Sequence, residues 1–231
     1  MTPLLRIEGM SVRRGGRALL DGVSFTAQRG EIVGVIGPNG AGKTTLFAAI
    51  AGFLPDARGR VLLEERASPV RSDALFYLPD GIRPWREQRV AWCLDFFAGL
   101  FGRDRDDEAI EALQLVPLLA QRAGSLSKGE AKRLALALAL GTSQPLLLLD
   151  EPFDGLDFRQ TRGAMELLRM RAAAGRTLVL SIHQLTDAAR VCDRFLLLDN
   201  GRAIAEGDLA QLRARAGIPN ATLEEVFLAL P

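Results

Sequence analysis

The sequence has few of the residues that build disulfide frameworks and zinc sites. It contains two cysteines, Cys93 and Cys192, and a single histidine, His183. Two cysteines this far apart in the sequence are too few for a disulfide framework or a zinc site. We therefore expect both thiols to be reduced and buried, as is usual in a cytosolic protein.

Long hydrophobic runs and an excess of charge are also absent. The most apolar stretches, residues 91–101 and 134–140, are shorter than the roughly 18 residues of a membrane-spanning helix. Residues 1–6 lack the charged start and the apolar stretch of a signal peptide. The formal net charge of +1 gives no electrostatic case for nucleic acid as a partner. We expect neither a nucleic-acid partner nor a direct membrane span.

The hydrophobic pattern predicts an α/β protein. A chain of 231 residues suits one large domain, or one domain with a small inserted lobe. The first part is expected to hold strands at 4–12, 23–28, 31–36, 61–63 and 75–78, with a helix at 43–51. A mostly helical insert is expected at about 84–142, with its last helix at 130–141 and buried on most sides. Strands at 146–150, 177–181 and 195–198 then alternate with helices at 158–173 and 185–191. The continuous apolar runs at 146–149 and 178–180 favour parallel strands covered on both faces.

A glycine-rich segment between a predicted strand and a predicted helix has the spacing of a phosphate-binding loop. It reads Gly37, Pro38, Asn39, Gly40, Ala41, Gly42, Lys43, Thr44 and Thr45. Glycines let backbone N–H groups curl around a phosphate, and the helix start adds its dipole. Lys43 is one of only three lysines in the chain, which makes its position more informative. We expect Lys43 to reach the β- and γ-phosphates of a nucleotide and the Thr44 hydroxyl to bind Mg²⁺.

Two carboxylates and the single histidine follow buried strands further along the chain. Asp150 and Glu151 end the run that begins at residue 146, and His183 follows the run at 177–181. The carboxyl ends of parallel strands meet at one edge of the sheet, where such folds bind ligands. Asp150 is expected to hold Mg²⁺, Glu151 to activate water, and His183 to sense the terminal phosphate. Together with the phosphate loop, these residues predict an ATPase.

A short segment at residues 126–130, Leu-Ser-Lys-Gly-Glu, is one that a general phosphate-loop protein does not need. With the motifs above and the sequence Asp-Gly-Leu-Asp at 154–157, it makes the chain resemble the nucleotide-binding subunit of an ATP-binding cassette (ABC) transporter, of a bacterial exporter-like type. The resemblance runs from residue 4 to residue 210. The family signature is Leu-Ser-Gly-Gly-Gln, so Ser127 and Gly129 match it, while the third and fifth residues depart from it.

The resemblance implies both a fold and a function. The fold is a P-loop NTPase core of mainly parallel sheet, with an N-terminal antiparallel β subdomain and an inserted α-helical subdomain, in one ABC ATPase domain over residues 1–231. The subunit would bind ATP and Mg²⁺, hydrolyse ATP and drive a separate transmembrane permease. Two copies, or one copy and a paralogous cassette, would pair head to tail, with Ser127 and Gly129 of one chain facing the phosphate loop of the other. The protein would be cytoplasmic and would lie on the inner face of the cell membrane through the permease.

Three positions depart from the family pattern within the implied site. Arg14 stands where an aromatic residue usually stacks on adenine, and its planar guanidinium can also stack. Asp80 stands where a glutamine usually contacts the metal and the water, and we expect Asp80 to contact the metal. Lys128 has two interpretations: it adds a cation near a phosphate, or it points into solvent.

Two other function classes are open to the sequence. One is a soluble ABC ATPase that acts in translation or DNA repair, but the translation type usually carries two cassettes, and residues 45–126 leave no room for the long coiled coil of the repair type. The other is a phosphate-loop kinase or GTPase, which would leave the signature and His183 unexplained. We favour the transport subunit.

Two segments bear on the partner and on the direction of transport. Residues 221–230 resemble the end of exporter-type cassettes, which favours export, although amphipathic helix packing also explains their pattern. The segment after Asp80 contains Pro84, Trp85, Trp92, Phe96 and Phe97. We expect most of these to form the core of the helical lobe and one or two to line an exposed apolar patch for the permease.

Overall fold

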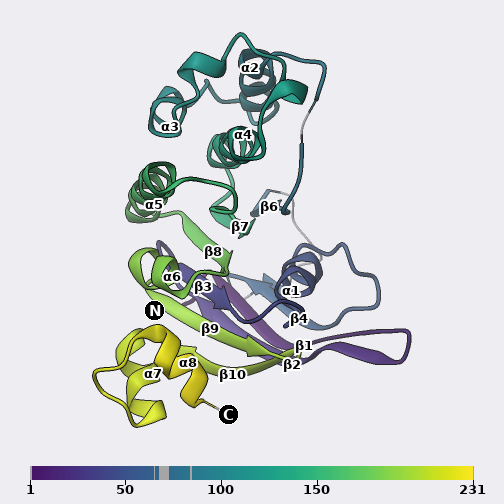
Figure 1. The fold of residues 1–231 in the computed structure, drawn as a ribbon. Coiled ribbons are helices and arrows are strands. Elements are labelled where there is room, and N and C mark those ends of the chain that lie inside the picture. Colours follow the sequence, from purple (N-terminus) through teal and green to yellow (C-terminus); the bar gives the residue numbers. More distant parts are fainter. Residues whose placement is uncertain (1, 65, 68–72, 84, 231) are drawn as a thin grey trace.

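The protein has two β-sheets, with a helical lobe above them and two further helices along one side (Figure 1). The computed structural model describes residues 2–64, 66–67, 73–83 and 85–230. The strands are β1 (Leu5–Arg14), β2 (Arg17–Ala27), β3 (Ile32–Ile36), β4 (Arg58–Leu63), β5 (Arg66–Ala67), β6 (Leu75–Leu78), β7 (Leu146–Asp150), β8 (Thr177–Ile182), β9 (Arg194–Asp199) and β10 (Arg202–Gly207). The α-helices are α1 (Lys43–Ile50), α2 (Val90–Leu100), α3 (Asp107–Ala112), α4 (Lys128–Leu140), α5 (Phe158–Ala173), α6 (Leu185–Val191), α7 (Leu209–Ala216) and α8 (Leu223–Ala229).

The smaller sheet is antiparallel and has the order β2-β1-β4-β5. Its strands β1 and β2 form a hairpin with Gly15 and Gly16 at the turn, between the paired residues Arg14 and Arg17. Both glycines have positive φ, 55° and 78°, which is the conformation that a two-residue turn of the primed type requires. This sheet is the N-terminal antiparallel subdomain that the family resemblance implies.

The larger sheet has the order β10-β9-β3-β8-β7-β6, and all its neighbouring pairs except β10–β9 are parallel. Every residue of β3, β7 and β8 is buried, which confirms the prediction of parallel strands covered on both faces. Strand β10 was not predicted. It follows an Asn200-Gly201 turn in which both residues have positive φ, a strong hairpin signal that the apolar pattern alone does not reveal.

Two hydrophobic cores hold the layers together. One lies around α1, where Leu46, Phe47 and Ile50 pack with residues of both sheets. The other joins the opposite face of the larger sheet to α5, α6 and the helical lobe. Helix α4 is the centre of the lobe, and all of its residues from 131 to 140 are buried, as predicted. It begins at Lys128 and not at residue 130, because Ser127 caps its first turn.

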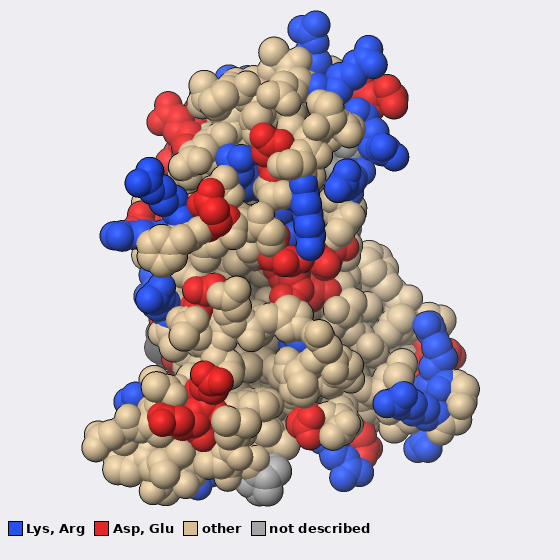
Figure 2. Space-filling view, in the orientation of Figure 1, with Lys and Arg blue, Asp and Glu red and all other residues tan. Residues whose placement is uncertain are grey.

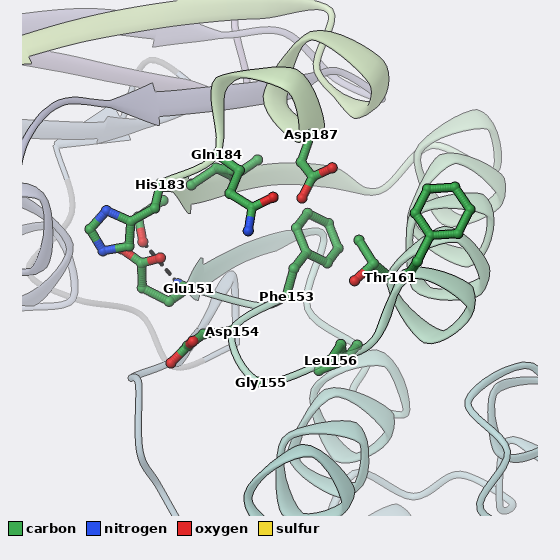
Figure 3. Close-up of a pocket in the computed structure, with 12 residues that line it drawn as sticks. Glu151, Phe153, Asp154, Gly155, Leu156, Thr161, His183, Gln184 and Asp187 are labelled. Atoms are coloured by element: carbon green, nitrogen blue, oxygen red, sulfur yellow. Dashed lines mark hydrogen bonds and ion pairs between the residues drawn. The ribbon is translucent and has the colours of Figure 1, made fainter.

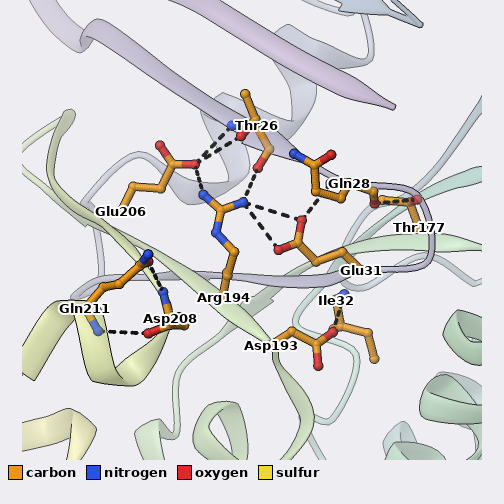
Figure 4. Close-up of polar contacts among 10 residues, drawn as sticks. All are labelled: Thr26, Gln28, Glu31, Ile32, Thr177, Asp193, Arg194, Glu206, Asp208 and Gln211. Carbon is orange, nitrogen blue, oxygen red and sulfur yellow. Dashed lines mark hydrogen bonds and ion pairs between the residues drawn. The ribbon is translucent and has the colours of Figure 1, made fainter. Parts of the chain in front are cut away.

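An arginine at the start of β9 ties the two sheets together (Figure 4). The Arg194 guanidinium lies 2.6 Å from Glu206 of β10 and 3.3 Å from Glu31, just before β3, and it also donates to the carbonyl of Thr26 in β2. Glu206 in turn accepts from the backbone N–H of Thr26. These half-buried charges are paired and hydrogen-bonded, as burial requires. The network fixes how the smaller sheet meets the larger one.

Both cysteines lie in the interior of the protein. Cys93 and Cys192 are buried and free, and burial raises the pKa of both thiols, so neither is a reactive thiolate. Among the described residues, no helix combines the length and the apolar character needed to cross a membrane. Pro84, at which the predicted insert begins, lies outside the described residues. From Val90 onward the insert is helical, as expected.

Candidate active site

The phosphate-binding loop connects β3 to α1, and several of its residues must be glycine for steric reasons. A Cβ atom on Gly37 would lie 2.1 Å from the carbonyl oxygen of Leu198 in β9, which no other residue could tolerate. Gly40 and Gly42 have φ of 82° and 106°, in the region that favours glycine. Gly42 is also the N-cap of α1, so the loop opens directly onto a helix start.

Lys43 is buried within this loop. Its side chain is 6% exposed, and its Nζ donates to the carbonyls of Gly37, at 2.7 Å, and Pro38, at 3.2 Å. Burial lowers the pKa of Lys43, while the neighbouring carboxylates Glu151 and Asp150 act in the opposite direction. The ammonium group therefore has only carbonyl ligands from its own loop and two acids nearby, and phosphate oxygens would be stronger partners.

An open cavity of about 450 Å³ lies against the loop and brings most of the predicted residues together. Lys43, Thr44, Asp80, Glu151 and His183 all line it, although they come from four separate parts of the chain. Thr45, Asn39, Gly40 and Gly42 line it as well. The cavity is thus bounded by the loop on one side and by the carboxyl ends of β6, β7 and β8 on the other.

The cavity extends to the β1–β2 hairpin, where Arg17 and Leu19 line it. Arg14, which the sequence predicts to stack on the base, is not among the lining residues and faces Arg17 across the hairpin ladder. Arg17 is a candidate binding residue that the sequence analysis missed. The signal was the Gly15-Gly16 turn, since it fixes which residues of the two strands flank the turn.

Asp150 and Glu151 are held by the neighbouring strand. The Ser181 hydroxyl donates to Oδ1 of Asp150 at 2.5 Å and accepts from the backbone N–H of Glu151 at 2.9 Å. Glu151 adopts a φ of 52°, a conformation that is uncommon for a residue with a side chain and that re-aims the chain after β7. The one serine therefore sets the position of both acids.

The carboxylate of Asp150 has an oxygen atom that could bind a cation. The residue is buried, and its Oδ2 atom has no hydrogen-bond partner in the structure. A buried carboxylate oxygen without a partner is costly, and a divalent cation would satisfy it. Among the described residues, no group of three or more His, Cys, Asp or Glu side chains is arranged to hold a metal. A Mg²⁺ ion here would take Asp150, the Thr44 hydroxyl, water and the phosphates of the nucleotide, which is its usual ligand set.

Glu151 and His183 lie together at the boundary between this cavity and a neighbouring one of about 280 Å³, which Figure 3 shows. His183 Nε2 lies 2.9 Å from Glu151 Oε1. Burial raises the pKa of Glu151 to about 7; Lys43 opposes this, and Asp150, Asp80 and Asp154 add to it. Burial also lowers the pKa of His183. A carboxylate with a pKa near neutrality is well matched to accept a proton from water.

The signature segment lies outside this cavity. Ser127 caps α4: its Oγ accepts from the N–H of Glu130, and Glu130 accepts from the N–H of Ser127 at 2.8 Å. This capping box explains physically why glutamate serves at the fifth signature position. Gly129 is also required within its own chain, because a Cβ there would lie 2.5 Å from the carbonyl oxygen of Gly155. Neither Ser127 nor Gly129 lines the cavity that holds Lys43.

Two lysines in and near the signature are paired with acids. Lys128 lies along Gly155 and places its Nζ 2.6 Å from Oδ2 of Asp154, and its side chain is 64% exposed. Lys132 places its Nζ 2.5 Å from Oδ1 of Asp80. The structure therefore gives Asp80 an ammonium partner. Its predicted contact with a metal remains a prediction.

Comparison with known proteins places this arrangement in a family. Residues 20–154 match the family described as ABC transporter. The chain is 36% identical over 219 residues to the hemin import ATP-binding protein HmuV of Pseudomonas aeruginosa, covering 86% of this chain and 84% of that protein. It is 34% identical to the Nod factor export ATP-binding protein I of Ralstonia nicotianae, over 89% of this chain and 67% of that protein. A solved structure of the ATP-binding subunit of an ABC transporter superimposes with a TM-score of 0.89 at 29% identity, over 97% of this chain and 98% of the other.

Proposed function

This chain belongs to the ABC transporter family as an ATP-binding subunit with ATPase activity, and from that premise we propose that two cassettes bind two ATP molecules between them and drive a separate permease. Residues 1–231 form one cassette, which pairs with a second copy or with a paralogue. The permease holds it at the inner face of the cell membrane. The observation that carries the proposal is the separation of Ser127 and Gly129 from the cavity that contains Lys43 and Glu151.

The separation matters because the helix start at Ser127 offers what a phosphate needs. The N–H of Gly129 lies in the first turn of α4, where helical N–H groups have no acceptor within the helix. The Ser127 hydroxyl accepts from Glu130 and keeps its own proton for donation. Since these donors do not reach the cavity of their own chain, we infer that they bind the γ-phosphate held by another chain.

The residues of the cavity have separable roles in hydrolysis. Lys43 binds the β- and γ-phosphates, and Thr44 and Asp150 hold Mg²⁺, which when bound neutralises phosphate charge. Glu151 accepts a proton from the attacking water. His183 contacts Glu151 and orients it toward the γ-phosphate, so that loss of either side chain disturbs the same step.

Loss of His183 tests this assignment. His183→Ala is expected to lower ATP turnover about a hundredfold, because it removes a group placed against the reacting water and phosphate. Binding of ATP, followed by calorimetry, is expected to change little. Gln184→Ala is the control, since Gln184 is the next residue and lines only the neighbouring cavity. Turnover that is equal in the two variants would assign His183 a structural role.

The head-to-tail pairing can be tested at Ser127 without loss of its helix cap. In a chain that also carries Glu151→Gln, Ser127→Asn and Ser127→Asp both retain a capping side chain, but the aspartate adds a negative charge opposite the phosphate. With Mg·ATP we expect the Asn variant to form a dimer in light scattering and the Asp variant to remain a monomer. Dimers of equal stability in both variants would contradict the pairing.

An exposed aromatic cluster on α2 supports a protein partner at the helical lobe. Trp92 and Phe96 are each 40% exposed and stack with ring centroids 4.7 Å apart, and Trp85 packs edge-on against both. Phe97 packs into the lobe against Phe76, as expected of core residues. Three exposed rings are more than the one or two that the sequence predicted. A contiguous apolar surface of this kind is where we place the permease contact.

The direction of transport stays outside the proposal. Residues 221–230, which favoured export, contain α8, and its buried Leu223 and Val226 belong to the main core. Amphipathic packing therefore accounts for the pattern of this segment. The names of the similar proteins include exporters, of Nod factor and of the bacterial Atm1 family, and importers, of hemin, phosphonates and cobalt.

A further inference from the structure

A buried lysine of the helical lobe is paired with an acid of the candidate nucleotide site. Lys132, in the second turn of α4, is 7% exposed, and its Nζ lies 2.5 Å from Oδ1 of Asp80. Asp80 follows β6 and lines the cavity that also contains Lys43 and Glu151. It lines a second cavity too, of about 210 Å³, together with Lys132. The ion pair thus stands between the lobe and the nucleotide cavity.

Asp80 is one of several acids that surround the place where a polyanion must bind. Asp80, Asp150 and Asp154 all act electrostatically on Glu151, and each disfavours its negative charge. One patch of acidic side chains on this face of the molecule lies between the helical lobe and the sheets (Figure 2). A triphosphate that enters this site without a cation meets repulsion from each acid that has no positive partner.

The lysines of the chain are arranged to offset this charge. Lys43 lies in the phosphate loop, Lys132 pairs with Asp80, which lines the same cavity, and Lys128 pairs with Asp154 outside that cavity. The pair at Lys128 is largely exposed, so solvent screens it and its effect is small. In the other pair the Lys132 side chain is 7% exposed and that of Asp80 is 44% exposed, so solvent screens this pair less than the pair at Lys128.

We propose that Lys132 is a positioning residue of the nucleotide site, which holds the Asp80 carboxylate against α4 and neutralises its charge. The triphosphate is then repelled by one acid fewer. The metal would be bound by Asp150 and Thr44, without Asp80. The proposal rests on the binding of ATP in this cavity. It assigns Asp80 the role of a charge held by the lobe, in place of the predicted metal contact. The alternative is that the ion pair only joins the lobe to the core and has no electrostatic effect on the bound nucleotide.

The two roles predict opposite signs for two single substitutions. Lys132→Met leaves an unpaired carboxylate beside the phosphates, so ATP binding in EDTA is expected to weaken about tenfold. Asp80→Asn removes the acid and leaves the ammonium, so ATP binding in EDTA is expected to tighten about threefold. The double variant is expected to lie within about threefold of the native chain, because neither charge remains. If the ion pair had only a structural role, both single variants would bind ATP more weakly.

The metal supplies a second readout. With saturating Mg²⁺, the loss in Lys132→Met is expected to shrink to about threefold or less, because the freed carboxylate can attract the cation. Calorimetric titration of the full chain with ATP, once in EDTA and once in MgCl₂, measures both conditions, and thermal unfolding checks that each variant folds. If Lys132→Met does not fold, Asp80→Asn decides alone: tighter binding in EDTA supports the proposal, and equal or weaker binding overturns it.

A matched control is an ion pair that joins α5 to the same lobe. Arg171 forms a half-buried ion pair with Asp106, at 2.8 Å, and neither residue lines the nucleotide cavity. Arg171→Met is expected to lower the unfolding temperature and to leave both dissociation constants unchanged. An equal loss of affinity in Arg171→Met and Lys132→Met would show that any broken ion pair of the lobe has this effect, and would overturn the proposal. Absence of ATP binding by the native chain would instead refute the proposed function.

Discussion

Replacement of Glu151 by glutamine is expected to lower ATP turnover by roughly 10²–10⁴-fold while ATP remains bound. The substitution keeps the size of the side chain and removes its capacity to accept a proton. Burial has already raised the pKa of this carboxyl to about 7, which suits a base that works near neutral pH. Single-turnover hydrolysis and calorimetric ATP binding, measured on the same preparation, separate the two effects.

The glutamine variant also reports on assembly. In the head-to-tail pairing proposed above, Mg·ATP would stay between the two cassettes when hydrolysis stops, so the variant is expected to persist as a dimer that light scattering detects. The contact between Glu151 and His183 can still form through the amide oxygen of glutamine. Hydrolysis within twofold of the native rate would remove Glu151 from the mechanism.

Replacement of Lys43 by alanine is expected to weaken ATP binding about 10- to 100-fold, which corresponds to the loss of charge-assisted hydrogen bonds to the phosphates. The loss should be large because the ammonium is buried and lies among backbone carbonyls and acids, where it is poorly screened. Turnover at low ATP concentration should fall at least as far. Calorimetric titration measures the affinity directly.

Two controls accompany the Lys43 variant. Alanine leaves the carbonyls of Gly37 and Pro38 without their donor, so thermal unfolding must show that the loop still folds. Arg162→Met removes an exposed cation that pairs with Glu166 on α5, away from the cavity, and is expected to leave affinity unchanged. Native-like ATP binding by Lys43→Ala would contradict the assignment of the phosphate loop.

The strands and helices that the sequence predicted best are those with a continuous apolar run or a strong capping signal. Strand β7 and helices α5 and α6 have the predicted bounds, since β7 is a run of four leucines before Asp150 and α5 begins after a capping box at Asp157. Strand β10 was missed because its residues, Arg202–Gly207, show no apolar pattern of their own. Its position depends on pairing with β9 across the Asn200-Gly201 turn.

The sequence predicted which residues belong to the site more fully than it predicted the contacts among them. The phosphate loop, Asp150 at the end of β7, Glu151 after it and His183 lie together because parallel strands present their carboxyl ends at one edge of the sheet. The partners of Lys128 and Lys132 lie 26 and 52 residues away in the sequence, and no local pattern links them. Those two ion pairs depend on how the lobe packs against the core, which only the folded chain defines.

Because the chain has only three lysines, a reagent that acylates amines has few targets, and Lys43 of the nucleotide site is one of them. An amine-acylating reagent can modify the N-terminal amine and three lysine side chains. Lys43 lines the nucleotide cavity, and Lys128 and Lys132 line the neighbouring cavity that also contains Asp80. Lys128 is the accessible one, whereas Lys43 and Lys132 are shielded until the lobe or the loop opens. Peptide mass spectrometry after brief acylation would therefore follow the opening of this site in the native protein, with no engineered probe.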